Sequence, residues 1–211
     1  MLSWIKDLLF FPDRFFLQSD KETVNLVPPA VIVGLSGLAG AAFLVGETRF
    51  YDPLMLLIIS FSLLWMILMP FISWGIYTVI FYYLGTWFSG SGTLERTAQN
   101  TGYGLLPSTL LGLVILCGSA IVMYDPGTFS SFVPGYGTPA LTWYFAVGGI
   151  VLSLVSLFWS GYIWTYGLSH AHAILPAKAA LMVALVVLLS ALLIVWPPIL
   201  NAMMMSMYTV G

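Results

Sequence analysis

The chain has 211 residues, of which 60% are hydrophobic and 7% are charged, and its mean hydropathy is +1.01. An ordinary soluble domain carries about 25% charged residues, so this composition excludes a soluble globular enzyme and a disordered chain. Six Lys and Arg residues cannot neutralise many phosphates, which excludes a nucleic-acid binder. Long apolar runs, rather than short alternating segments, favour an all-α polytopic membrane protein over a transmembrane barrel.

Residues 1–27 are predicted to form an amphipathic arm at the membrane interface. In the first eleven residues, apolar side chains fall on one side of a helix and polar ones on the other, with Phe10 as an exception. Pro12 then restarts the chain in a second amphipathic turn. Ser19 and Glu22 have the spacing of a capping box, which predicts a helix beginning at Ser19. The arm is either a solvated, membrane-hugging segment or a docking surface for a cytoplasmic partner.

Residues 28–211 are predicted to form a domain of five transmembrane helices. The second apolar stretch is longer than a bilayer requires and contains Pro70, which favours one kinked and tilted helix over two re-entrant halves. Pro197 and Pro198 are expected to interrupt the far end of the last stretch. The five predicted spans lie near residues 28–46, 54–88, 105–123, 140–168 and 176–200.

The first predicted span carries a face of small residues. Their spacing lets another helix backbone approach closely, either within this chain or in a second copy of it. The residues of this helix-packing face are Gly34, Ser36, Gly37, Gly40 and Ala41.

The distribution of basic residues predicts the orientation. With five spans the two termini lie on opposite sides, and a cytoplasmic N-terminus places five of the six bases inside. The positive-inside rule therefore predicts the N-terminus in the cytoplasm and the C-terminus outside, in the cell (plasma) membrane. No cleaved signal peptide is evident, because the first apolar run starts too far from the N-terminus. The inner bases are Lys6, Arg14, Lys21, Arg96 and Lys178, and the outer base is Arg49.

The sequence offers little chemistry within the membrane. No carboxylate, Lys or Arg lies mid-span, which argues against an ion-coupled carrier and against an enzyme. His170 and His172 would point about 200° apart on a helix and lack further ligands nearby, so we predict an interfacial loop role for them. Cys117 is expected to be a small buried residue. We predict no catalytic residue, no metal and no cofactor.

A short polar segment between the second and third spans is expected to form a helix on the inner face. Thr93 can cap this helix, which carries Glu95 and Arg96. Tyr103 follows and can place its hydroxyl among the lipid headgroups. Pro107 falls in the first turn of the third span, where proline is tolerated.

These motifs, in this order, resemble those of the Yip-domain proteins, five-span membrane proteins named for interacting with Ypt/Rab GTPases. The resemblance implies a five-helix membrane domain and, for eukaryotic members, a place in vesicle traffic at the Golgi and ER. With its short arm, the chain looks more like the archaeal or bacterial members. The segments that carry the resemblance are 11–16 (Phe-Pro-Asp-Arg-Phe-Phe), 92–97 (Gly-Thr-Leu-Glu-Arg-Thr), 102–107 (Gly-Tyr-Gly-Leu-Leu-Pro) and 167–170 (Gly-Leu-Ser-His).

Two functions are open at this point. The first is a non-enzymatic scaffold that organises the lipid bilayer or recruits a partner, either a cytoplasmic protein or a second copy of the chain. The alternative is a permease-like or scramblase-like protein that translocates lipid or a small molecule along a path lined by Trp74, Tyr77 and Trp164. The predicted partner-binding face consists of Asp13, Arg14, Glu95, Arg96, Tyr103, Pro107 and His170.

Overall fold

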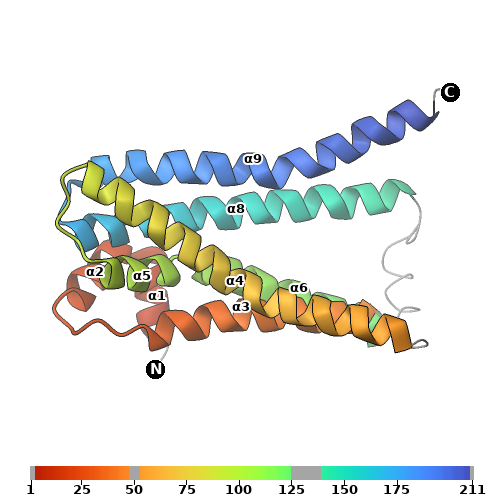
Figure 1. The fold of residues 1–211 in the computed structure, drawn as a ribbon, viewed down its shortest axis with the longest axis horizontal. Helices are drawn as coiled ribbons and strands as arrows, with labels where there is room; N and C mark the ends of the chain where they lie inside the picture. Colours follow the sequence, from red (N-terminus) through yellow and green to blue (C-terminus); the bar gives the residue numbers. More distant parts are fainter. Residues whose placement is uncertain (1–2, 48–52, 125–138, 210–211) are drawn as a thin grey trace.

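The structure, a computed structural model, is all-helical in the residues that it describes. It describes the backbone of residues 3–47, 53–124 and 139–209 and the side chains of residues 3–41, 59–117 and 147–200. Long helices run along the molecule, and short ones lie at one end of it (Figure 1). The short helices are α1 (Ser3–Phe10), α2 (Pro12–Ser19) and α5 (Leu94–Tyr103). The long helices are α3 (Val27–Glu47), α4 (Pro53–Trp87), α6 (Leu106–Tyr124), α8 (Pro139–His172) and α9 (Pro176–Thr209).

The long helices confirm a multi-pass membrane protein. Within the described residues, four segments are long and apolar enough to cross a membrane. Helix α3 has 21 residues, but the part with described side chains is shorter, so the fifth span stays a prediction. Large apolar side chains such as Phe61, Trp87 and Leu193 are exposed along these helices, as lipid-facing positions require. The four segments are Ile59–Trp87, Leu94–Cys117, Val147–His172 and Pro176–Leu200.

Proline lies inside two of the long helices, and the sequence predicts its effect correctly in one of them. Pro70 lies inside an unbroken α4, which crosses the bundle obliquely, in agreement with a single tilted helix (Figure 1). Pro197 and Pro198 also lie inside an unbroken helix, so the predicted interruption of the last span is wrong. A helix of this length keeps enough hydrogen bonds on either side to continue, and it bends instead (Figure 1).

Two further expectations are corrected at the level of single residues. Helix α8 continues to His172, so His170 and His172 lie in its last turn and not in a loop. Cys117 is exposed rather than buried. A small apolar side chain loses nothing by facing lipid, because lipid tails are as apolar as a protein core.

The arm ends in a turn where the sequence predicts a helix start. Ser19 is the last residue of α2, and the backbone N–H of Glu22 donates to the Ser19 carbonyl oxygen at 3.1 Å. The hydroxyl of Ser19 accepts a hydrogen bond from the Gln99 side-chain amide at 3.3 Å. Ser19 therefore ends one helix and does not begin another, and the predicted capping box is wrong.

Two clusters of buried apolar side chains hold the helices together. One is centred on Trp164 of α8, which packs with Phe81 of α4 and Met182 of α9. The second cluster joins the arm to the bundle through Leu8 and Phe16, both at most 1% exposed. The arm is therefore part of the folded core and not an appendage.

The small-residue face of α3 contains the closest approach between α3 and α4. A Cβ atom added to Gly37 would lie 2.9 Å from the carbonyl oxygen of Ile67 and 3.0 Å from its Cα. A Cβ on Gly34 would meet the ring of Phe71 at an ordinary 3.6 Å, whereas one on Gly40 would meet nothing within 4 Å. Only Gly37 is therefore required to be glycine by the packing of α3 on α4.

The other small residues of this face have different surroundings. Ser36 and Gly40 line a cavity of about 380 Å³ between α3, α4 and α6. Ala41 is 7% exposed and packs inside the bundle. The face therefore packs within this chain, and its use in contacts with a second copy stays a prediction.

The variant Gly37→Ala is expected to lower the stability of the bundle by about 1–3 kcal/mol, because the new methyl group meets backbone atoms that cannot move aside. Thermal unfolding in detergent measures the loss. Gly40→Ala, in the same helix but facing open space, is the matched control and should leave the unfolding temperature unchanged or slightly higher. Equal losses in the two variants would contradict the assignment of Gly37 to the contact between α3 and α4.

Candidate functional site

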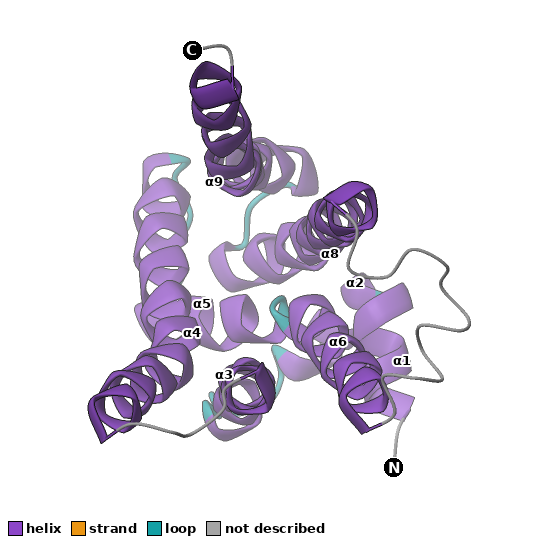
Figure 2. Ribbon diagram, turned by 90° about the vertical axis from the view of Figure 1, so that its right-hand side faces the viewer, coloured by secondary structure: helices purple, strands orange, loops and turns teal. Residues whose placement is uncertain are grey.

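The short polar helix α5 is enclosed by the ends of the long helices. Seen along the bundle, the long helices surround α5, and it contacts α3, α4 and α8 (Figure 2). The Thr93 hydroxyl accepts a hydrogen bond from the backbone N–H of Arg96 at 3.2 Å, which confirms the predicted N-cap. A buried polar group without a partner costs about 1–3 kcal/mol, so the neighbouring elements have to supply partners. The α5 side chains exposed by 3% or less are Thr97, Gln99, Asn100 and Thr101.

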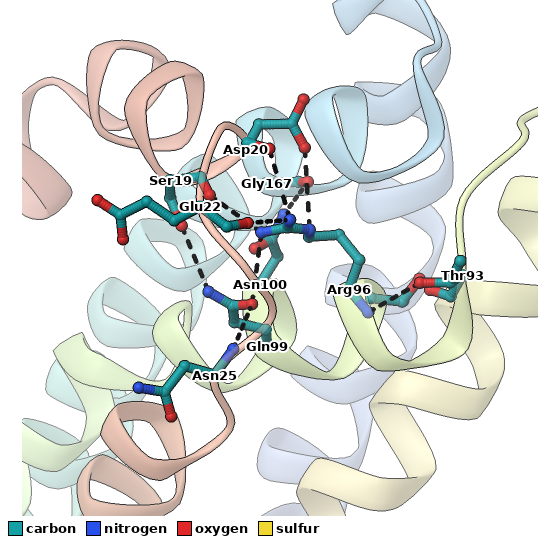
Figure 3. Close-up of polar contacts among 10 residues, drawn as sticks. Ser19, Asp20, Glu22, Asn25, Thr93, Arg96, Gln99, Asn100 and Gly167 are labelled. Atoms are coloured by element: carbon teal, nitrogen blue, oxygen red, sulfur yellow. Dashed lines mark hydrogen bonds and ion pairs between the residues drawn. The ribbon is translucent and has the colours of Figure 1, made fainter.

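Arg96 fastens the end of the arm to α5 (Figure 3). Its guanidinium donates to the backbone carbonyl oxygens of Ser19 at 3.0 Å and Glu22 at 2.7 Å, with a longer contact to that of Asp20 at 3.5 Å. The carboxylate of Asp20 lies 3.8 Å from the Arg96 Nε. A planar guanidinium carries five donors, so one side chain can hold a whole turn of backbone in place.

Gln99 and Asn100 make two more connections from the same helix (Figure 3). The Gln99 side chain donates to the Ser19 hydroxyl at 3.3 Å and accepts from the backbone N–H of Asn25 at 3.3 Å. The Asn100 amide donates to the Gly167 carbonyl oxygen of α8 at 2.7 Å. Arg96 and Gln99 of α5 thus hold residues 19–25, while Asn100 holds α8.

Two indoles bind the main chain of α5 from opposite helices. The Nε1 of Trp74 in α4 donates to the Ala98 carbonyl oxygen at 2.8 Å, and that of Trp164 in α8 donates to the Thr101 carbonyl oxygen at 2.9 Å. The sequence suggested that these tryptophans line a translocation path. Their polar atoms are instead bonded to α5, which ties the ends of α4 and α8 together.

The glycines of the segment 102–107 leave room for these indoles. A Cβ on Gly102 would lie 2.9 Å from the Trp74 Nε1, and one on Gly104 would overlap the Trp164 ring. Tyr103 lies between them and is 7% exposed, with its ring edge-on to Phe15 at 5.1 Å. This motif therefore serves the packing of α5 against tryptophan.

The two histidines at the end of α8 bind different elements. His172 is fully buried, and its Nε2 lies 3.0 Å from the Thr97 hydroxyl. His170 faces the arm, with its Nε2 2.9 Å from the carboxylate of Asp13. Their opposite directions agree with the predicted angle between them. Within the part of the chain that the structure describes, no three potential metal-ligating side chains lie together.

The structure brings together only some of the residues predicted to bind a partner. Arg96, Asp13 and His170 are engaged within the chain by the contacts above. Tyr103 and Pro107 are buried. Arg14 and Glu95 are exposed and form no ion pair with another described residue. Partner binding by this face stays a prediction, and these two are its exposed charges that no other described residue pairs with.

Sequence reasoning missed the residues that hold α5 in place. The available signal was the run of residues 97–101, Thr-Ala-Gln-Asn-Thr, because uncharged polar side chains in an apolar chain need protein partners. The indoles of Trp74 and Trp164 were predicted to line a translocation path, and only the fold shows which carbonyl groups they reach.

The variant Arg96→Gln is expected to release the arm, because a hydrogen bond to a charged group contributes about 1.5–3 kcal/mol. Amide hydrogen exchange in residues 11–26 should rise by about tenfold or more, while exchange in α9 should not change. Lys21→Gln is the matched control, since Lys21 is an exposed base of the same segment. Unchanged exchange in Arg96→Gln would show that the apolar cluster alone holds the arm.

Comparison with known proteins finds a matching family. The Yip1 domain family model matches residues 6–197, a range that includes most of α1, all of α2 and α5, and most of α9. No curated protein and no solved structure matches the chain. The chain belongs to the Yip1 domain family.

Proposed function

We propose that the chain is a non-enzymatic scaffold that organises the membrane through a cap at one end of the bundle. The cap consists of α1, α2, residues 20–26 and α5. The observation that carries the proposal is the outer surface of the arm, where large apolar side chains remain exposed although the arm is docked. Phe10, Phe11 and Leu17 are each 54% exposed, and Trp4 is 39% exposed. Aromatic and apolar side chains at such a surface insert into the headgroup region of a bilayer.

The arm is held firmly enough to transmit this insertion to the bundle. Besides the apolar cluster and Arg96, the Trp159 indole of α8 donates to the Leu9 carbonyl oxygen at 3.0 Å. Its ring also lies edge-on to Phe10 at 5.7 Å. Two short helices fixed beside the spans add volume to one leaflet only, and such asymmetry favours curved membrane.

The bases support a cap in the cytoplasmic leaflet. Lys6, Arg14, Lys21 and Arg96 belong to the cap, and Lys178 lies in the first turn of α9 at the same end of the bundle (Figure 1). Bases gather on the cytoplasmic side of membrane proteins. We therefore place the N-terminus in the cytoplasm. A cytoplasmic partner of the cap would meet Glu95, which stays exposed there.

Membrane tubes drawn from giant vesicles test the scaffold proposal. The reconstituted chain should be enriched in the narrow tube relative to a lipid dye. Replacing Phe10, Phe11 and Leu17 by serine should remove the enrichment, because the surface can no longer insert. The control carries Phe10→Leu, Phe11→Leu and Leu17→Phe, which keep the surface apolar. Equal enrichment of the serine variant and the control, both with the unfolding temperature of the unaltered chain, would contradict the proposal.

A second function, translocation of lipid or a small molecule, is favoured by one observation. A cavity of about 440 Å³ between α4, α6, α8 and α9 is lined by hydroxyl groups. The hydroxyls of Tyr77 and Ser190 lie 3.1 Å apart, and those of Ser108 and Ser156 lie 3.0 Å apart. Ser108 also lines the cavity beside α3, so polar groups continue from one cavity to the other. Polar side chains at membrane depth often mark a pathway for a polar group.

Movement of labelled lipid between leaflets tests this alternative in the same vesicles. Ser153 lines the hydroxyl-lined cavity, so Ser153→Leu should fill part of it and slow any translocation, while Ser153→Ala keeps the space. Translocation above that of empty vesicles, slowed by leucine and not by alanine, would replace the scaffold proposal. No translocation by folded, inserted protein would remove the alternative.

A further inference from the structure

A cavity of about 470 Å³ lies within the arm, against the start of α3 and the end of α5. It is bounded by α1, α2, residues 19 and 22, the start of α3 and the end of α5. Phe15 and Tyr103, whose rings pack edge-on at 5.1 Å, form an aromatic wall, and the half-exposed Trp4 lies at the rim. This cavity is distinct from the hydroxyl-lined cavity among the spans, because the two share no lining residue.

Three charged side chains line the cavity, and all three are available to a ligand. They are Asp7 of α1, Arg14 of α2 and Glu22 of the turn after α2. None of them forms an ion pair with another described residue. Arg96 donates to the backbone carbonyl oxygen of Glu22 and not to the Glu22 carboxylate. Figure 3 shows the Glu22 carboxylate directed away from the guanidinium.

One base and two acids beside aromatic rings are complementary to a zwitterion with a phosphate and an ammonium group. A guanidinium binds phosphate oxygens with two parallel hydrogen bonds. Carboxylates accept hydrogen bonds from a primary ammonium, and an indole face attracts a cation. The three side chains carry a net charge of −1, which disfavours a headgroup that is only anionic.

We propose that this cavity binds the headgroup of a phosphoethanolamine lipid. Arg14 binds the phosphate, Asp7 and Glu22 accept hydrogen bonds from the ammonium group, and Trp4 covers that group. A lipid, rather than free phosphoethanolamine, fits the place of the cavity, because the arm beside it has exposed apolar side chains. The proposed function puts these side chains at headgroup depth, where acyl chains can extend beside them. The site goes beyond the proposed scaffold function and does not require the chain to bend membrane.

Native mass spectrometry of the full chain in detergent tests the site. Dioleoyl lipids with ethanolamine, choline and glycerol headgroups are added at equal amounts, and one ethanolamine lipid per chain should be retained in preference. Arg14→Gln should weaken its retention about tenfold, the loss expected for one charge-assisted interaction. Glu22→Gln and Asp7→Asn should each remove the preference for ethanolamine over choline. Lys6→Gln, an exposed base of α1 outside the cavity, is the matched control and should bind as the unaltered chain does.

Several outcomes would overturn the proposal. Equal retention of the three lipids overturns it, as does unchanged ethanolamine-lipid retention in Arg14→Gln. Displacement of the lipid by soluble phosphoethanolamine at the same concentration would assign the site to the free compound instead.

The unfolding temperature of each variant is measured as a control for folding. Arg14→Lys, which keeps the charge without the planar fork, should retain more lipid than Arg14→Gln. The tube assay on Arg14→Gln separates this site from the scaffold proposal. If the variant no longer retains the ethanolamine lipid but is still enriched in the tube, the lipid site and the scaffold function are independent of each other.

Discussion

The polar side chains of α5 are buried, and the arrangement of the cap follows from the need to give them partners. Water does not reach these side chains, so the partners come from protein. The turn after α2 supplies carbonyl groups to Arg96, and α8 supplies one to Asn100. Helices α4 and α8 each send an indole to the main chain of α5. Because one short helix binds all of these elements, the arm, α4 and α8 keep fixed positions relative to one another.

The same constraint explains why polar and apolar side chains are distributed differently along the molecule. Away from the cap, the long helices expose apolar side chains and are held by clusters such as the one around Trp164. Among the serines that line the cavities there, Ser108 pairs with Ser156, and Ser190 pairs with Tyr77. The cap thus concentrates charge and aromatic surface at one end of the bundle.

Much of the fold could be predicted from the sequence, because an apolar run of sufficient length allows few alternatives to a helix. The long helices begin and end within a few residues of the predicted spans, apart from the longer ends of α8 and α9. Local signals worked where no tertiary contact competed, as at Thr93. The local signal failed at Ser19, whose hydroxyl is bound by the side chain of Gln99.

The candidate site was harder to predict, because a charge in a sequence does not reveal which atoms it meets. Arg96 looked like a group for a partner protein, and its guanidinium faces the backbone of its own arm. Glycine was the better guide to packing. Gly37 indicated the contact between α3 and α4, and the pair Gly102 and Gly104 indicated a close approach that the tryptophans occupy.

Arg96 donates hydrogen bonds to main-chain carbonyl oxygens, which every residue carries. The identity of the side chains at Lys21 and Glu22 is therefore of little importance for closing the cap, whereas Asp20 adds the contact of its carboxylate with the guanidinium. This stretch can change its charge and chemistry in evolution while the architecture beneath it is preserved. In this chain the attachment of the arm is therefore separate from the side chains that the arm presents on its surface.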